Sequence, residues 1–355
     1  MTADAVTSRA NTTPSDVDVP SSSGLPDEAG TARELVEPGL RAAVEELDPE
    51  IRDVVRYHLG WVDRSGNPVT GGGGKALRPA LTVLCAQAAG VDPGAAVPGA
   101  VAVELVHNFS LLHDDVMDGD TERRSRPTVW WLYGVPTAIL AGDALLTLAV
   151  EVVERSGDHA GTSRVTGAVQ ELIRGQRQDV GFERRHEVAL HECLEMADGK
   201  TGALMCCAAG IGPLLAGAPP ETARTLGRFG RELGMAFQLV DDLLGIRGDP
   251  AVTGKPVHSD LRARKKTVPV VAALNSGTTA GNRLAEIYFD DGAVDETQLH
   301  HMADLIERSG ALHWTERTAD EHVQQALRNL RRVCPPPGIH TALHQFAAFV
   351  TERDT

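Results

Sequence analysis

Apolar residues recur with helical spacing along most of the chain. From about Ala32 onward, long segments rich in Ala, Leu, Val, Glu and Arg alternate with short breaks of Gly, Pro and Asp, such as 155–161 and 275–282. Roughly ten such runs, with no alternating strand pattern between them, predict an all-α fold. We expect one large helical bundle over residues 31–355. Residues 1–30 are rich in Ser, Thr, Pro and Asp without a period, which predicts a disordered tail.

Composition and net charge limit the kinds of partner and substrate that we expect. The chain has 355 residues, of which 42% are hydrophobic and 23% are charged, as in globular proteins. Its 34 basic and 49 acidic residues give a net charge of −15. We therefore expect no nucleic-acid partner and no binding to anionic membranes. A small anionic substrate is compatible with this charge where basic groups or metal ions gather locally.

The cysteines and the apolar stretches indicate a cytoplasmic protein. The five cysteines include no CxxC pair, which argues against a zinc site or a disulfide framework. The first residues have no apolar core, so a signal peptide is not expected. The uncharged stretch Ala203–Pro220 contains several Gly and Pro. We interpret it as a buried core helix with a turn at its end, and expect no membrane span.

A first acidic motif ends an apolar helical run. Asp114, Asp115 and Asp118 form a DDxxD pattern. Residues i and i+4 of a helix share a face, so the first and last of these carboxylates point the same way. Mg²⁺ bound by one or two carboxylates together with substrate phosphates would neutralise them. Arg123 and Arg124 follow directly and are suited to the remaining phosphate oxygens. A solvated acidic helix end is the alternative.

A second acidic pair follows another apolar run. Asp241 and Asp242 come after Gln238, and Lys255, Lys265 and Lys266 follow them. Facing helices of a bundle can project two such clusters into one cavity. We therefore expect both acidic motifs to border a shared site.

A glycine-rich segment supplies further basic groups. GGGGKALRP (71–79) carries Lys75 and Arg78. Its glycines permit a close approach of the backbone to a ligand. The P-loop pattern is absent because Ala76 follows Lys75, which disfavours a nucleotide triphosphatase. The segment suits a second diphosphate, while a flexible linker with two exposed bases is the alternative.

These motifs together resemble one family. GGGGKALRP, HDDVMDGDTERR, GQRQD, KTG, FQLVDD and GK…SDL…KKTVP occur in this order. The sequence is similar to the trans-isoprenyl diphosphate synthases over about residues 35–353. The resemblance implies a helical bundle around a deep apolar pocket, usually a homodimer, that joins isopentenyl diphosphate to dimethylallyl, geranyl or farnesyl diphosphate.

The resemblance also implies roles for single residues. Asp114 and Asp118 would bind two Mg²⁺ ions on the allylic diphosphate, and Asp241 would bind a third. The remaining residues implied on the allylic side, as catalytic, diphosphate-binding or cavity-lining groups, are Asp115, Arg123, Gln176, Asp179, Lys200, Thr201, Gln238, Asp242, Lys255 and Lys265. Those implied at the isopentenyl diphosphate site are Lys75, Arg78, His107 and Arg124.

The product length is expected to depend on the floor of the pocket. Phe109 lies five residues before Asp114, about 7.5 Å along a helix, with the small Ser110 beside it. In the resembled family this pattern is similar to geranylgeranyl diphosphate (C20) synthases. Farnesyl diphosphate (C15) is the alternative product, and Phe109 as a plain core residue is the alternative role.

Three positions depart from the family pattern. Gly245 replaces a frequent Asp, while Ser125 and His258 each replace a usual Gly. A non-catalytic subunit of a heteromeric synthase is therefore one alternative, although both leading Asp pairs are present. A class I terpene cyclase is another, but no NDxxSxxxE motif follows, and such an enzyme would not need Lys75 and Arg78.

Overall fold

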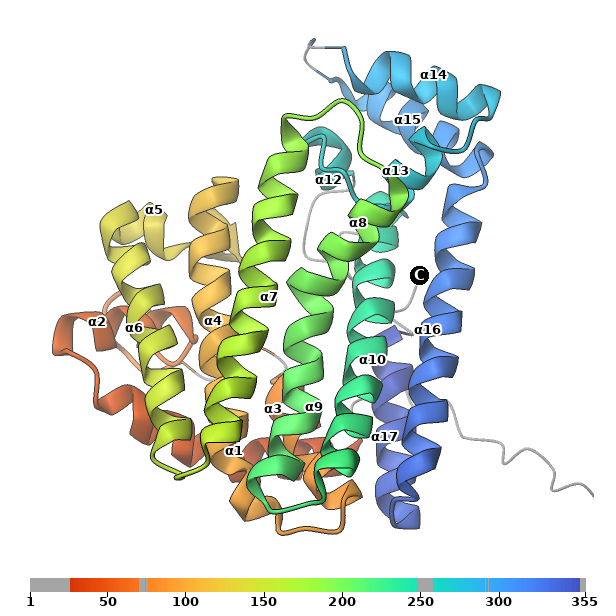
Figure 1. The fold of residues 1–355 in the computed structure, drawn as a ribbon. Helices are drawn as coiled ribbons and strands as arrows, with labels where there is room; N and C mark the ends of the chain where they lie inside the picture. The colour runs from red at the N-terminus through yellow and green to blue at the C-terminus, as the bar shows by residue number, and fades with distance from the viewer. Residues whose placement is uncertain are drawn as a thin grey trace, which may run out of the picture.

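The chain forms the expected all-α bundle (Figure 1). The computed structural model describes residues 26–69, 74, 76–247, 258–290, 292 and 294–351, so the predicted site residues Lys75 and Lys255 lie outside the described residues. The elements in chain order are α1 (Asp27–Glu45), α2 (Pro49–His58), α3 (Leu77–Ala88), η1 (Pro93–Ala96), α4 (Val97–Asp118), β1 (Glu122–Arg123), β2 (Arg126–Pro127), α5 (Val129–Tyr133), α6 (Val135–Glu154), α7 (His159–Glu183), α8 (Leu190–Ala197), η2 (Asp198–Gly202), α9 (Ala203–Leu215), α10 (Pro220–Arg247), α12 (Ser259–Arg262), α13 (Val268–Leu274), α14 (Thr279–Tyr288), α15 (Glu296–Arg308), α16 (Ala311–Val333) and α17 (Pro337–Thr351).

The long helices stand side by side and form the body of the bundle (Figure 1). Helix α10 packs against both α9 and α16, α4 packs against α6, and α3 packs against α4 and α9. Helices α14 and α15 lie together at one end and share a separate small core with α16. Helices α4, α7 and α10, which carry the predicted acidic residues, all pack against α9.

The prediction of a buried core helix within Ala203–Pro220 is confirmed. Helix α9 is buried along almost its whole length, because its Ala, Gly and Cys side chains let α3, α7 and α10 pack closely around it. Gly217 follows with a φ of 80°, the left-handed conformation of a turn.

Two helical stretches, Pro93–Asp118 and Val135–Glu154, are long and apolar enough to cross a membrane by length and composition alone. In the first, 67% of the apolar window is buried inside the fold, as in a core helix. In the second, which is α6, only 33% is buried. Helix α6 therefore keeps an apolar face that a single chain does not cover.

The folded part begins slightly before the predicted boundary at residue 31. Helix α1 starts at Asp27, and Asp27 and Glu28 in its first turn oppose the positive end of the helix dipole. Ala29 and Ala32 are buried, which anchors this turn to the core. Most of the predicted tail, residues 1–25, lies outside the described residues.

Candidate active site

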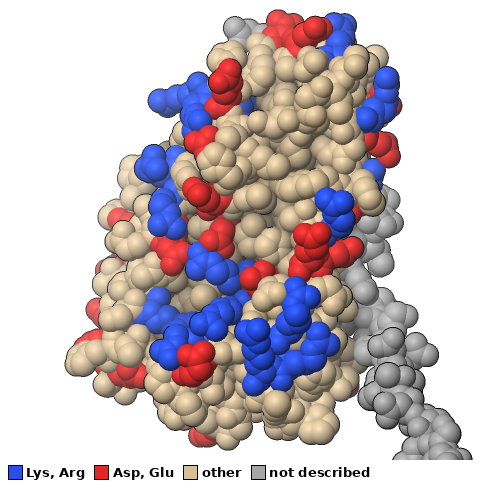
Figure 2. All heavy atoms as spheres, turned by 45° about the vertical axis from the view of Figure 1, so that its right-hand side comes forward, with Lys and Arg blue, Asp and Glu red and all other residues tan. Residues whose placement is uncertain are grey.

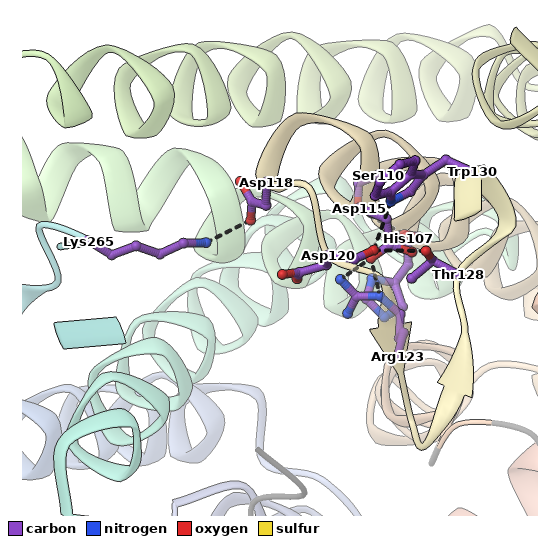
Figure 3. A network of polar contacts seen from close by, with 9 residues as sticks. All are labelled: His107, Ser110, Asp115, Asp118, Asp120, Arg123, Thr128, Trp130 and Lys265. Atoms are coloured by element: carbon purple, nitrogen blue, oxygen red, sulfur yellow. Dashed lines mark hydrogen bonds and ion pairs between the residues drawn. The ribbon is translucent and has the colours of Figure 1, made fainter. Parts of the chain in front are cut away.

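The first acidic motif occupies the carboxyl end of α4. Gly119 ends the helix with a φ of 70°. Asp114 and Asp118 are four residues apart, so they lie one turn apart on the last two turns of α4. Asp115 is only 1% exposed. Its Oδ1 accepts a hydrogen bond from Nε of Arg123 at 2.7 Å and forms an ion pair with Nη2 of the same residue at 2.6 Å (Figure 3). Asp115 therefore holds an arginine of the site in place.

A short hairpin presents the two arginines. Strands β1 and β2 pair antiparallel, and the turn residues Arg124 and Ser125 have φ angles of 53° and 57°. Two consecutive left-handed residues are typical of a type I′ turn, which explains why a glycine is expected where Ser125 stands. The Tyr57 hydroxyl donates to the carbonyl of Pro127 at 2.8 Å and ties the hairpin to α2.

Two lysines pair with carboxylates of the site. Lys265 Nζ donates to Asp118 Oδ2 at 2.7 Å and joins the segment before α13 to α4 (Figure 3). Lys200 Nζ donates to Asp179 Oδ2 at 2.6 Å. Lys266 instead faces two aromatic rings. Of the two neighbouring lysines, Lys265 is thus the one that reaches the acidic motif.

The pKa values reflect this crowding of charges. Burial raises the pKa of Asp114 to about 6, Lys200 opposes the shift and Asp118 adds to it. For Lys200, burial acts to lower the pKa, but the carboxylates of Asp114 and Asp179 outweigh it and raise the pKa above its usual value. Lys200 therefore stays charged. An added cation near Asp114 would stabilise the ionised form of its carboxylate.

A π-helical turn, η2, carries Lys200 and Thr201 between α8 and α9. Such turns occur often at functional sites. A Cβ on Gly199 would lie 3.2 Å from the Cα of Gly175 on α7, and a Cβ on Gly175 would collide with the amide of Lys200. Only glycines permit this crossing. It brings Asp179, one turn further along α7, within reach of Lys200.

The second acidic pair lies inside α10, which continues to Arg247. Asp242 is 6% exposed and accepts hydrogen bonds from Gln238 Nε2 at 2.7 Å and from the Val268 amide at 2.8 Å. Burial raises the pKa of Asp242 to about 7. Asp242 thus fixes the start of α13, whereas Asp241 is exposed.

Two amide side chains border this region. Gln238 Oε1 accepts a hydrogen bond from the Thr201 hydroxyl at 2.6 Å, which links η2 to α10. Gln176 is 6% exposed, and within the described residues its two amide atoms have no hydrogen-bond partner. A buried amide without a partner is costly, so a ligand that bonds to Gln176 would remove that cost.

Basic groups gather beside α4 at the predicted isopentenyl diphosphate site. Burial lowers the pKa of His107 well below its usual value, and Arg78 and Arg124 act in the same direction. The guanidinium of Arg124 lies against Gly74, where a Cβ would be 2.6 Å from Nη2. The site therefore pairs a neutral imidazole with at least two guanidinium groups.

The remaining two departures from the family pattern, Gly245 and His258, lie in distinct surroundings. A side chain at Gly245 would collide with Oδ2 of Asp260. The carboxylate of Asp260, which is not among the predicted site residues, thus takes up the space of the expected Asp. His258 has a φ of 60°, a conformation that favours glycine, and its ring packs edge-on against His300 with centroids 5.1 Å apart.

The surface mixes both signs of charge. On the face drawn in Figure 2, Lys and Arg side chains lie next to Asp and Glu side chains around hollows in the surface. A net charge of −15 therefore leaves room for local basic surface.

Comparisons with known proteins show the family to which the chain belongs. The family model described as Polyprenyl synthetase matches residues 60–306. The (2E,6E)-farnesyl diphosphate synthase of Mycobacterium tuberculosis is 50% identical over 330 residues, which cover 91% of this chain and 92% of that protein. The geranylgeranyl diphosphate synthase of the same organism is 46% identical over 297 residues, which cover 82% and 85%. The crystal structure of the polyprenyl synthetase from Streptomyces coelicolor A3(2) aligns with a TM-score of 0.87 at 49% identity, over 91% of this chain and 98% of that one. The chain therefore belongs to the polyprenyl synthetase family and is a prenyl diphosphate synthase, a prenyltransferase.

Proposed function

We propose that this synthase joins isopentenyl diphosphate head to tail to an allylic diphosphate by 1′-4 coupling and releases geranylgeranyl diphosphate (C20). The observation that carries the proposal is the pairing of lysines with carboxylates at the end of α4. Lys265 bonds to Asp118, and the charge of Lys200 acts on Asp114 and Asp179. Acidic metal ligands and cationic phosphate ligands thus stand side by side, as a metal-bound diphosphate requires.

The donor set suits Mg²⁺. Within the described part of the chain, no three His, Cys, Asp or Glu side chains form a ready-made metal site. Mg²⁺ does not need one, because it keeps waters and binds through one or two carboxylates plus substrate phosphates. Asp114 and Asp118 would hold two of the three expected ions, and the exposed Asp241 would hold the third. The raised pKa of Asp114 supports this role, since a bound cation stabilises its ionised form.

In the proposed mechanism, the chain's own residues orient two diphosphates. Mg²⁺, when bound, withdraws charge from the allylic diphosphate and makes it a better leaving group. Arg123, Lys200 and Lys265 bind that diphosphate while its C–O bond breaks, and Lys255 would join them. The hydroxyl of Thr201 and the amide oxygen of Gln238, fixed by their mutual hydrogen bond, direct negative dipole ends toward the allylic cation.

The second substrate is positioned by Arg78, His107 and Arg124, together with Lys75. Its double bond supplies the electron pair for the new bond to C1 of the allylic cation. A proton then leaves the adduct and passes to the released diphosphate. The product is five carbons longer than the primer.

The C20 product is proposed from the residues below Asp114. Phe109 is 6% exposed, and its ring packs edge-on against His113 with centroids 4.8 Å apart. His113 in turn fills the space beside Gly142 of α6. A single aromatic ring braced in this way supports a floor for a C20 chain. A C15 product is the alternative, since the relatives above include both a farnesyl and a geranylgeranyl diphosphate synthase.

We also propose a cytoplasmic homodimer without a membrane span. Helices α5 and α6 leave five large apolar side chains uncovered in the single chain: Trp131, Tyr133, Val135, Ile139 and Leu140. Neighbouring exposed apolar side chains mark an interaction surface. The mass in solution, measured by light scattering, tests the dimer.

Product analysis tests the proposed reaction. The purified protein is incubated with Mg²⁺, isopentenyl diphosphate and either dimethylallyl, geranyl or farnesyl diphosphate, and the dephosphorylated alcohols are sized. A single C20 alcohol supports the proposal. A C15 alcohol replaces it with the alternative product. No product with any primer would favour the alternative of a non-catalytic subunit of a heteromeric synthase.

A further inference from the structure

A hydrogen-bonded pair, of half-buried Glu104 and buried Asn108, lies on α4 beside the proposed isopentenyl diphosphate site. Glu104 and Asn108 are four residues apart on one face of the helix. Asn108 is 1% exposed, and its Nδ2 donates to the carbonyl of Glu104 at 2.8 Å and to Glu104 Oε1 at 3.1 Å. The amide thereby fixes the direction of the carboxylate. Neither residue belongs to the motifs that define the site.

His58 at the end of α2 completes this network. Its ring hydrogen-bonds to Asn108, and burial lowers its pKa to about 3, helped by Arg124 and Arg123. The ring is therefore neutral at physiological pH and supports Asn108 without adding charge. Within the described residues, His58 Nε2 has no partner. His58 thus connects α2 and α4 behind the arginines.

The Glu104 carboxylate is the counter-charge of these arginines. Burial raises its pKa, and Arg78 is the strongest influence that opposes the shift, with Asn108 and Arg124 acting the same way. Conversely, burial lowers the pKa of Arg124, and Glu104 is the strongest influence that raises it. Glu104 and Arg124 line one cleft with Gly74, against which the guanidinium is pressed. The Arg124 guanidinium thus lies against the Gly74 backbone, in a cleft that Glu104 also lines.

We propose that Glu104, braced by Asn108 and His58, is a positioning residue that holds Arg78 and Arg124 toward the diphosphate of isopentenyl diphosphate. This inference rests on the proposed function of the two arginines. Neighbouring guanidinium groups repel one another, and a fixed carboxylate whose charge acts on both lets both stay in place before the substrate arrives. Binding then costs less ordering of long side chains.

The test compares the two substrates of one enzyme. Glu104→Ala is expected to raise the KM for isopentenyl diphosphate about tenfold or more, because a buried charge loses its partner. The KM for geranyl diphosphate should change by no more than about twofold, as for an independent site. Asn108→Ala should give a smaller rise of the same kind, and Glu104→Gln should recover part of the loss. Glu37→Gln is the matched control, because Glu37 lines the same cleft but pairs with Arg41 at 2.7 Å.

A double-mutant cycle with Arg124→Lys separates positioning from plain stability. Non-additive effects on the KM for isopentenyl diphosphate are expected, because Glu104 acts through Arg124. Additive effects, or an equal rise of both KM values, would overturn the inference. If Glu104→Ala does not fold, the cycle is run with Asn108→Ala under the same criteria. An Arg124→Ala variant with unchanged KM for isopentenyl diphosphate would overturn the proposed site itself. A raised KM in Arg124→Ala with none in the Glu104 and Asn108 variants would overturn only the positioning role.

Discussion

The raised pKa of Asp114 predicts that Mg²⁺ binding weakens under mildly acidic conditions. A carboxylate binds a metal in its ionised form. With a pKa of about 6, Asp114 is mostly ionised in neutral solution and mostly protonated one unit below its pKa. Lowering the pH from about 7 to about 5 reduces the ionised fraction, and with it the Mg²⁺ affinity of this site, about tenfold. This corresponds to about 1.4 kcal/mol. A surface Asp, with its ordinary pKa, would scarcely change over this range.

The neighbouring lysine supplies a second perturbation with a known sign. Burial raises the pKa of Asp114, and the charge of Lys200 is the strongest influence that lowers it. Lys200→Met should therefore raise the pKa of Asp114 further and move the loss of Mg²⁺ affinity to higher pH. Lys266→Met is the control, since Lys266 lies near the rings of Tyr288 and Phe289 instead.

Isothermal titration calorimetry of Mg²⁺ into the metal-free protein measures both effects. Titrations at several pH values, each in two buffers of different ionisation enthalpy, give the affinity and the protons released per ion. Proton release should grow as the pH falls through about 6, because the metal then displaces a proton from Asp114. An affinity that does not change across this range, or a midpoint that Lys200→Met leaves in place, would refute the reasoning.

Three further predictions address other parts of the molecule. Phe109→Ala should lengthen the product beyond that of the parent enzyme, at a cost of about 3–5 kcal/mol of stability; unchanged alcohol lengths on sizing, with a lowered Tm, would leave Phe109 as plain core. Gly245→Asp should not restore a metal ligand but should lower the Tm, since its side chain meets Asp260 Oδ2; Asp260→Ala in the same chain should reverse part of the loss, and a Tm unaffected by Gly245→Asp contradicts the collision. His58 binds a proton more weakly in the folded state, with a pKa of about 3, than in the unfolded state, with one near 6.5. The free energy of unfolding should therefore fall, by up to about 1.4 kcal/mol per pH unit, as the pH drops between those values; urea unfolding should give a shallower slope for His58→Gln, and an equal slope contradicts the neutral ring.

Local sequence was sufficient to predict the elements that carry the site. The four-residue spacing of Asp114 and Asp118 placed both carboxylates on one side of α4, because that relation depends only on helical geometry. The stretch that forms α9 is predicted as a buried helix for a different reason, since it carries no charge and its Gly and Pro argue against a membrane span. The second acidic pair was only partly foreseen. Asp241 and Asp242 are adjacent in sequence, so their side chains point in different directions. Asp242 bonds to the first residue of α13, while Asp241 is exposed.

Contacts between distant segments could not be predicted in this way. Asp118 and Lys265 are 147 positions apart, and only the packing of the bundle decides that Lys265 rather than Lys266 reaches the carboxylate. The same holds for Asp260 beside Gly245. Glu104 had a weak local signal, because it precedes His107 by one turn of the same helix, but a single carboxylate in an apolar run does not reveal which arginines it will meet. His58 gave no signal at all.

The crossing of Gly175 and Gly199 separates two properties of the enzyme that could otherwise change together. At this point the main chains of α7 and η2 touch, so main-chain contact rather than side-chain packing fixes the separation of Asp179 from Lys200. Substitutions that reshape the proposed apolar floor near Phe109 can therefore repack neighbouring side chains without separating Asp179 from Lys200. With the floor where we propose it, the product length can change in small steps while this ion pair stays intact.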